Sequence, residues 1–247
     1  MELNETQRER YGRHLSLSEI GEEGQIKLLR AKVLVVGAGG LGSPAALYLA
    51  AAGIGTIGIV DGDRVELGNL QRQILHTTPS VGTLKVSSAA ERLRALNPDT
   101  RLTLHPFRLS AANAAEIIAR YDFVIDATDN FRAKLLIAET CHMEAKPYSH
   151  AGISEFSGQT MTVNPGESAC LRCVFHEGKI PEKQIPTGPL GTLPGVMGAI
   201  QATETIKYLL SIGTPLCNTI LTYDCLSMTM RRVSVSRDPQ CPLCGKA

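Results

Sequence analysis

The stretch KVLVVGAGGLGSP, residues 32–44, decides how this chain folds. Apolar residues lead into the pattern Gly37-x-Gly39-x-x-Gly42, and the helix-compatible sequence PAALYLAAAG follows at 44–53. A strand, a tight glycine-rich turn and the start of a helix, in that order, are typical of a dinucleotide-binding unit. The stretch therefore predicts a nucleotide at the turn; the alternative is a turn that only packs a helix closely on a strand.

The composition is that of an ordinary globular protein. Of 247 residues, 43% are hydrophobic, and 25 Lys and Arg nearly balance 24 Asp and Glu, for a formal net charge of +1. This balance indicates neither nucleic acid nor a membrane surface as a partner. The charged N-terminus, MELNETQRERYGRHL, lacks the apolar core of a signal peptide, and no apolar run is long enough to span a bilayer. We therefore expect a cytoplasmic protein with a single domain over residues 1–247.

Strand and helix patterns alternate through the first half of the chain. Apolar strands are expected at 32–37, 56–63, 101–107 and 122–130, and helices at 43–53, 84–97, 110–121 and 131–145. Fully apolar strands that alternate with helices predict a parallel sheet with helices on both faces. The expected fold class is therefore α/β, with a Rossmann-like, mostly parallel sheet.

Two further segments flank this alternating unit. A helical extension, with Asn4 as its cap, precedes the unit over residues 1–30. After it, residues 147–166 read as two antiparallel strands joined at the turn-forming pair Ser157-Gly158. The sheet is therefore expected to change from parallel to antiparallel.

The last third of the chain begins with a stretch rich in glycine and proline at 178–195. Such a stretch cannot sustain a helix or a strand, and its length favours a mobile functional loop. A final helix is expected at 196–211, followed by strands at 219–224 and 228–236.

Asp61 marks the expected nucleotide site at the end of the second strand. It lies 24 residues after Gly37, near the spacing of about 20 at which an acidic residue binds the adenosine ribose. NAD and ATP share the adenosine, so the segment that follows, residues 62–86, distinguishes them. Its polar side chains suit the charge of a triphosphate better than a nicotinamide, and they are Asn69, Gln71, Arg72 and Lys85. The alternative is a solvated polar loop.

Asp129 and Asn130 follow the fourth strand, in the sequence VIDATDNFRAK. Ligands bind beyond the carboxyl ends of strands in an open parallel sheet, so both side chains should face the same crevice as Asp61. Mg²⁺ commonly takes one or two protein carboxylates together with phosphate oxygens and waters, which favours a magnesium site at Asp129. The alternative is that Asp129 caps the next helix. Asp126, inside the strand, is interpreted as structural.

Four of the seven cysteines form two Cys-x-x-Cys pairs, separated by 67 residues. Four thiolates are the closed set that a structural zinc ion takes, so the pairs predict a Zn²⁺ site that ties the C-terminal tail to the middle of the chain. Disulfides or a redox pair are the alternative. The predicted ligands are Cys170, Cys173, Cys241 and Cys244. Three other cysteines are expected to pack as small hydrophobic residues, namely Cys141, Cys217 and Cys225.

Taken together and in chain order, several motifs resemble the MoeB/ThiF/HesA family, bacterial relatives of ubiquitin-activating enzymes. They are RYGRHL, GAGGLG, DGDRVELGNLQRQ, VGTLKV, DATDN, GVMGAIQATETIK and the paired Cys-x-x-Cys motifs, and they cover essentially the whole chain. The resemblance implies an enzyme that uses ATP and magnesium to adenylate the C-terminal Gly-Gly carboxylate of a small ubiquitin-like sulfur carrier, of the MoaD or ThiS type, with release of pyrophosphate. It also implies a nucleotide-binding half at 31–150 and a carrier-binding and zinc half at 151–247.

The same resemblance assigns roles to individual residues. It assigns Asp61 to the ribose, and Asp129 to magnesium and to catalysis. Arg13, in RYGRHL, resembles an arginine that reaches the ATP of the other subunit, which implies a homodimer with sites completed in trans. Arg72 and Lys85 are catalytic through their charge. The full set of nucleotide-site residues is Gly37, Gly39, Gly40, Gly42, Asp61, Asp63, Asn69, Gln71, Arg72, Lys85, Asp129 and Asn130.

One segment departs from the family pattern. Relatives often carry a cysteine in the loop before the GVMG helix, whereas KIPEKQIPTGPLGTLPGVMG, residues 179–198, contains none. This difference favours an enzyme that stops at the acyl-adenylate and leaves sulfur delivery to another protein. The choice between a molybdopterin and a thiamine carrier stays open. An NAD-dependent oxidoreductase is the competing function, since the glycine turn permits it, and a noncatalytic scaffold with the same fold is a third.

Overall fold

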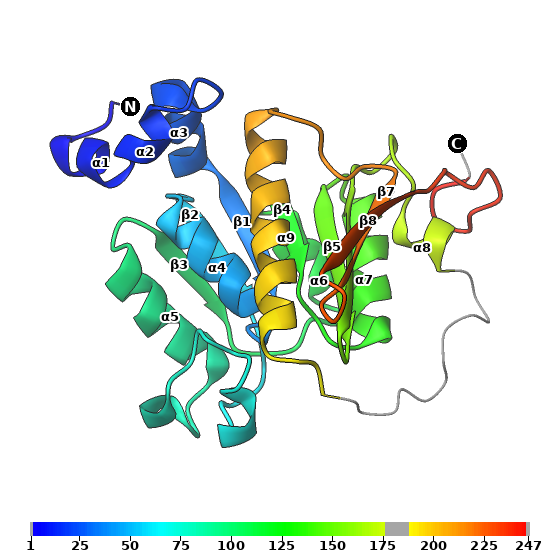
Figure 1. Ribbon diagram of the computed structural model, residues 1–247, viewed down its shortest axis with the longest axis horizontal. Coiled ribbons are helices and arrows are strands. Elements are labelled where there is room, and N and C mark those ends of the chain that lie inside the picture. Colours follow the sequence, from blue (N-terminus) through cyan, green and yellow to red (C-terminus); the bar gives the residue numbers. More distant parts are fainter. Residues whose placement is uncertain (1, 176–187, 246–247) are drawn as a thin grey trace.

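The computed structural model describes residues 2–175 and 188–245, which build one eight-stranded sheet with helices on both faces (Figure 1). The strand order is β3-β2-β1-β4-β5-β6-β7-β8. Five strands are parallel, namely β1 (Lys32–Val36), β2 (Thr56–Val60), β3 (Arg101–His105), β4 (Phe123–Asp126) and β5 (Tyr148–Ser154). Three antiparallel strands extend the sheet, namely β6 (Ser157–Val163), β7 (Thr219–Asp224) and β8 (Thr229–Ser234). The predicted α/β class is confirmed.

Two hydrophobic cores lie on opposite faces of the sheet. In β1, Val33 and Val35 belong to one core and Leu34 and Val36 to the other, because successive side chains of a strand point to opposite faces. The first core lies against α4 (Gly42–Ala51), α5 (Lys85–Leu96) and α9 (Thr192–Leu210). The second lies against α6 (Ala114–Ile118), α7 (Phe131–Met143) and α8 (Leu171–Val174). Helices on both faces explain why the parallel strands are apolar throughout.

Three cysteines fall where their apolar character suggests. Cys141 is fully buried in the core beneath α7, as predicted, and Cys217 and Cys225 are half-buried. Burial raises the pKa of the Cys141 thiol well above its ordinary value. The Cys141 thiol is therefore protonated and inert.

Strand β1 lies between β2 and β4, so the chain runs outward from β1 in both directions. At such a switch point the connections leave the carboxyl ends of neighbouring strands toward opposite faces and open a crevice. The glycine turn after β1, the segment after β2 and the turn after β4 therefore meet at one edge of the sheet. Two short 3-10 helices, η1 (Leu67–Asn69) and η2 (Thr78–Ser80), belong to the segment after β2.

The N-terminal extension is helical, as predicted, but it consists of three short helices, α1 (Glu5–Arg10), α2 (Gly12–Leu15) and α3 (Gly21–Arg30). Asn4 caps α1 with a capping box. Tyr11, which separates α1 from α2, is buried and accepts a hydrogen bond of 2.9 Å from the Asn97 amide, so the extension is fixed to the domain. Figure 1 shows these helices (blue) near the start of β1, away from the turn that joins β1 to α4.

The hairpin between β5 and β6 differs from the prediction. Ser154 pairs with Ser157, so the turn lies at Glu155 and Phe156, and Ser157 and Gly158 belong to β6. A Cβ at Gly158 would lie 2.7 Å from Met197 Cγ of α9. Gly158 therefore allows α9 to approach the sheet, and the predicted turn at Ser157-Gly158 is wrong because this packing signal resembles a turn signal.

Two helix boundaries also differ from the prediction. Helix α9 begins at Thr192, so part of the predicted loop at 178–195 is helical, and Pro194 lies in its first turn, where proline is tolerated. Residues 178–187 of that loop lie outside the described residues. The helix expected at 110–121 is confined to Ala114–Ile118.

No helix within the described parts of the chain has the length and apolar character needed to cross a membrane.

Candidate active site

The glycine turn between β1 and α4 is closed so tightly that side chains cannot be accommodated at two of its positions. Gly37 has a φ of 101°, and a Cβ there would lie 2.7 Å from the carbonyl oxygen of Ala127. A Cβ at Gly42 would lie 1.9 Å from the carbonyl oxygen of Gly37. The glycines therefore allow the turn to fold back on itself and to touch the turn that follows β4.

Asp61, at the end of β2, binds this turn directly. Its Oδ2 accepts a hydrogen bond of 2.8 Å from the Ala38 N–H, and its Oδ1 accepts one of 2.8 Å from the Asp63 N–H. Asp61 is only half-buried, and a carboxylate has about four acceptor positions, so it retains capacity for ribose hydroxyl groups. Asp61 therefore lies beside the glycine turn at the carboxyl end of β2, and its role as the ribose ligand stays a prediction.

His76 contacts the carbonyl group of the same residue, Ala38, and was not predicted. Its Nε2 lies 2.9 Å from the Ala38 carbonyl oxygen, and its Nδ1 lies 3.0 Å from Ser88 Oγ. Burial lowers the pKa of His76, so the imidazole is neutral, and its Nε2–H donates to the carbonyl. A lone histidine in a polar segment gives no periodic signal from which this contact could be inferred.

Lys85 and Arg108 meet at Asp63. Lys85 Nζ lies 3.3 Å from Asp63 Oδ2, and Arg108 lies 2.9 Å from Asp63 Oδ1. The hydrogen bond from Arg108 outweighs partial burial and, with Lys85, lowers the pKa of Asp63. Lys85 is buried and Arg108 is exposed. Arg108 was missed because it follows β3, far in sequence from the polar segment, and only the sheet brings it to Asp63.

The polar segment after β2 lies between the glycine turn and the start of α9. Asn69 Oδ1 accepts from the Glu66 N–H, and Arg72 donates to the Gly68 carbonyl oxygen at 3.2 Å. A Cβ at Gly40 would lie 3.5 Å from Arg72 Cγ, which puts the arginine stem beside the glycine turn. Asn69 and Arg72 are both half-buried.

Gln71 and Gln73 take different positions in this segment. Gln71 is exposed and its backbone contacts Gly191, just before α9. Gln73 is buried, and its amide nitrogen lies beside Gly39, 3.6 Å from where a Cβ would stand. The amide oxygen of Gln73 is buried without a hydrogen-bond partner among the described residues. The structure therefore brings Gln73 to the glycine turn, whereas Gln71 is the glutamine that was predicted from the sequence.

The turn after β4 carries the predicted magnesium ligand. Asn130 caps α7, since its Oδ1 accepts from the Ala133 N–H at 2.9 Å, so the capping alternative does not apply to Asp129. Asp129 is exposed, and among the described residues it makes no ion pair, with only a 3.5 Å contact from the Asn130 amide. The Asp63 carboxylate first, and Asp129 and Asp61 more weakly, raise the pKa of Arg108. The charges of three carboxylates therefore act on one guanidinium, and Asp63 is the one in direct contact with it.

Asp126 lies directly beneath this turn and is fully buried, which agrees with the structural role expected for it. It contacts Lys134 of α7 and His150 of β5. Neither residue was singled out from the sequence, because a single Lys in an amphipathic helix and a single His in an apolar strand resemble ordinary surface and core residues.

Arg13 lies on α2, exposed to solvent. Helix α2 adjoins the amino end of β1, whereas the glycine turn follows the carboxyl end of the same strand (Figure 1). The structure does not bring Arg13 to the glycine turn of the same chain.

The four predicted metal-binding cysteines come together. Their Sγ atoms all lie within 4.8 Å of one another, with separations of 3.8 Å for Cys170 and Cys173, 3.5 Å for Cys170 and Cys241, and 3.3 Å for Cys173 and Cys244. Four sulfurs at about 2.3 Å from a tetrahedral zinc ion would be about 3.8 Å apart, so the cluster fits zinc. The Asp238 N–H also donates to Cys173 Sγ at 3.4 Å, a contact typical of bound thiolates.

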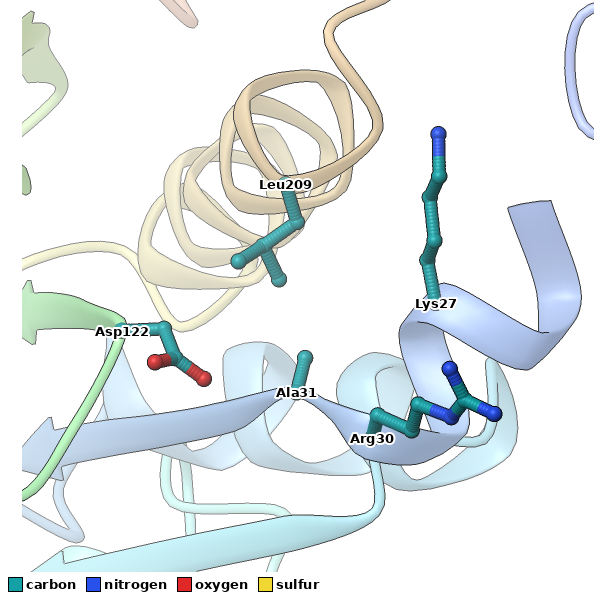
Figure 2. A pocket seen from close by; sticks show the side chains of 5 residues that line it. All are labelled: Lys27, Arg30, Ala31, Asp122 and Leu209. Carbon is teal, nitrogen blue, oxygen red and sulfur yellow. The ribbon is translucent and has the colours of Figure 1, made fainter. Parts of the chain in front are cut away.

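A pocket of about 250 Å³ lies at the opposite edge of the sheet (Figure 2). It is lined by Lys27, Arg30, Ala31, Asp122 and Leu209, from α3, the starts of β1 and β4, and the end of α9. Because Ala31 and Asp122 precede their strands, the pocket is separate from the crevice at the carboxyl ends of the strands. None of the lining residues was predicted to bind a ligand.

Comparison with known proteins identifies the family. The profile of the ThiF family matches residues 11–243. The SAMP-activating enzyme E1 of Haloferax volcanii is 45% identical over 250 residues, which cover 100% of this chain and 92% of that protein. The sulfur carrier protein adenylyltransferase of Thermus thermophilus is 44% identical over 246 residues, which cover 96% of this chain and 90% of that protein. The chain belongs to the ThiF family, as its motifs predicted.

Solved structures agree on the fold. A crystal structure of E. coli MccB with ATP superposes with a TM-score of 0.85 at 24% identity, over 96% of this chain and 75% of that chain. Another, of MccB with MccA-N7isoASN, gives a TM-score of 0.86 at 23% identity, over 98% of this chain and 76% of that chain. At this level of identity the likeness shows a shared fold.

Proposed function

We propose that the protein is an ATP-dependent adenylyltransferase that activates the C-terminal carboxylate of a small ubiquitin-like sulfur-carrier protein ending in Gly-Gly. The proposal is supported by three contacts in a member of the ThiF family: Asp61 binds the glycine turn, Lys85 pairs with Asp63, and the turn that carries Asp129 touches Gly37. Relatives that match over nearly their whole length are named as an adenylyltransferase of sulfur carriers and as an activating enzyme.

The reaction joins a carboxylate oxygen of the carrier to the α-phosphorus of ATP. As this bond forms, the bond from the α-phosphorus to the bridging oxygen breaks, and pyrophosphate leaves with the electron pair. The carboxylate is already ionised at neutral pH, so no general base is required. Catalysis therefore consists of positioning and of neutralising charge on the phosphates.

The chain supplies the groups for both tasks. Asp61 binds the ribose while its bond to Ala38 keeps the glycine turn in place. Lys85 and Arg72 lie at the same edge, and their cationic groups neutralise the triphosphate. Asp63 orients Lys85, Asn69 belongs to the capping box of η1, and Gln71 lies beside Gly191 at the start of α9.

Asp129 is the proposed ligand of Mg²⁺, with Asn130 fixing the end of the turn that carries it. An exposed carboxylate without an ion pair among the described residues suits a hard cation that prefers oxygen ligands. When bound, magnesium would neutralise negative charge on the phosphates. The cysteine cluster is the proposed site of a structural Zn²⁺, because its four sulfurs leave no open coordination position.

Arg13 is proposed to act in trans, in a homodimer. Its position near the amino end of β1 separates it from the glycine turn of its own subunit, so only a second copy of the chain could present it there. Buried anchors such as Tyr11 hold the extension rigidly, which supports a fixed rather than a swinging arginine.

The product proposed is the acyl-adenylate itself, released to a separate sulfur-delivering protein, in the cytoplasm. The support is the absence of cysteine from the sequence of residues 179–198. Whether the carrier serves molybdopterin or thiamine synthesis follows from the carrier and not from the enzyme's site.

The test is exchange of labelled pyrophosphate into ATP by the zinc-loaded protein with a MoaD-type or a ThiS-type carrier. We expect exchange with one of the two and none when the last glycine of that carrier is removed. Folded protein that binds NADH instead of ATP, and catalyses no exchange with either carrier, would support the oxidoreductase alternative. Binding of ATP without exchange would support the noncatalytic alternative.

A further inference from the structure

A buried charged group lies beneath the turn that carries Asp129. Lys134 Nζ of α7 lies 3.3 Å from both carboxylate oxygens of Asp126, and it donates a hydrogen bond of 2.7 Å to the Ala151 carbonyl oxygen of β5. His150 Nδ1 lies 2.9 Å from Asp126 Oδ2. Asp126, Lys134 and His150 are all at least nine-tenths buried, so three elements, β4, β5 and α7, meet at one ion pair.

The charges in this group are well defined. Burial by itself would raise the pKa of Asp126, but the charge of Lys134 and the hydrogen bond from His150 outweigh burial and hold that pKa at about 2. Burial lowers the pKa of His150, so its ring is neutral and donates through Nδ1. Among the described residues, Lys134 is therefore the cationic partner of the Asp126 carboxylate.

Asp126 in turn fixes the start of the turn at 127–130. Its Oδ1 accepts hydrogen bonds from the Thr128 N–H at 3.1 Å and from Thr128 Oγ1 at 2.6 Å. The far end of the turn is held by Asn130, which caps α7, and the Lys134 N–H donates to the Asn130 carbonyl oxygen at 3.2 Å. Asp129 lies between these two anchors, and Lys134 is connected to both of them.

The ion pair is not required for stability in itself. Burying two charges costs solvation free energy, and well-packed apolar residues of similar volume are often neutral or stabilising in their place. An apolar pair could not, however, accept two hydrogen bonds from Thr128. Lys134 keeps Asp126 ionised and in a fixed orientation. Because Asp126 binds Thr128, the backbone beside Asp129 is fixed as well.

We propose that Lys134 is a positioning residue for the reaction: it holds the turn at 127–130 in place through Asp126 so that Asp129 is preorganised for magnesium-bound ATP. This role rests on the proposed function, because it assigns the metal to Asp129. Lys134 does not touch the nucleotide or the metal, and its effect passes through Asp126 and Thr128.

The test compares Lys134→Gln and Lys134→Arg with a matched control, Lys207→Gln. Lys207 also contacts a buried carboxylate, that of Glu204, and a backbone carbonyl, that of Thr214, but it lies near the far end of α9. Binding of ATP is measured by calorimetry without carrier, with and without Mg²⁺. The factor by which Mg²⁺ increases ATP affinity should be about tenfold smaller in K134Q than in wild type. In K134R the same factor should stay within about threefold of the wild-type value. K207Q should melt at a lower temperature and keep the full gain.

A folded K134Q protein with the wild-type magnesium-dependent gain would overturn the proposal, as would an equal loss in K207Q. If K134Q does not fold, Thr128→Ala removes only the hydroxyl bond to Asp126 and should still reduce the gain, by about threefold; an unchanged gain would count against the proposal. If wild-type protein shows the gain but catalyses no pyrophosphate exchange, the proposed function fails while the positioning role stands. If wild-type protein shows no gain, the assignment of Asp129 fails and the positioning role fails with it.

Discussion

Replacing Lys85 with methionine separates the catalytic role of this lysine from its structural one. In the folded protein, Lys85 Nζ contacts Asp63, whose side chain is 46% exposed and keeps a second partner, Arg108, at 2.9 Å. Methionine preserves most of the buried aliphatic stem. Because the lost ion pair is partly solvated and Asp63 stays paired, the free energy of unfolding should fall by at most about 1 kcal/mol. For a chain of this size that corresponds to a decrease in melting temperature of roughly 2–4 °C.

The effect of Lys85→Met on the reaction should be much larger. A preorganised cation beside a phosphoryl group that is being transferred contributes about 10²–10³ in rate, so carrier-dependent pyrophosphate exchange should fall by about that factor. Both quantities are measured on the same preparation, by thermal melting and by exchange at saturating ATP. Lys27→Met, which removes an exposed lysine at the opposite edge of the sheet, is the control and should change neither. Exchange within about threefold of wild type would refute the catalytic role of Lys85, and a decrease in melting temperature far beyond about 4 °C would refute its minor role in stability.

The cysteine cluster, Arg13 and Asp126 can each be tested by substitution. Cys244→Ser, or a chelator strong enough to remove zinc, should lower the melting temperature by more than about 5 °C. The ATP affinity of the folded protein should not change. Identical melting curves would argue against a structural metal. Mixing Arg13→Ala with Asp129→Asn, each inactive alone, should restore about one quarter of the sites if Arg13 acts in trans in a homodimer, and no recovery would indicate action in cis. The pKa of Asp126 is held at about 2, below its usual 3.8, so its contribution to stability is present above about pH 4 and lost as the pH falls toward 2. The free energies of unfolding of wild type and Asp126→Asn, measured with denaturant at a series of pH values, should therefore converge over that window. Curves that stay parallel would contradict the ionised state of Asp126.

The parts of the site that could be predicted from the sequence are those with a local physical signature. Gly37 and Gly42 were identifiable because a turn that folds back on itself excludes side chains, and Asp61 because it follows an apolar strand at a characteristic spacing. The cysteine pairs were identifiable because two Cys-x-x-Cys motifs together provide a complete tetrahedral ligand set.

The residues that were missed depend on contacts between elements far apart in the chain. Arg108 reaches Asp63 only because β3 lies beside β2, and Lys134 reaches Ala151 only because α7 packs against β5. Gly158 was assigned to a turn because a Ser-Gly pair is a local turn signal. In the structure it allows α9 to approach the sheet, and the contact that requires a glycine comes from Met197, nearly forty residues later. Sequence patterns report local conformation, and these contacts are set by packing.

Adenylation of the carrier is tested most directly by the intact mass of the carrier after incubation with this enzyme, ATP and Mg²⁺, with the reaction quenched in acid. The carrier should become heavier by one adenylyl group on its C-terminal carboxylate, with an equal amount of pyrophosphate formed. A carrier that lacks the last glycine should give no such product. A carrier of unchanged mass, with folded enzyme that binds ATP, would contradict adenylation of the carrier by this protein.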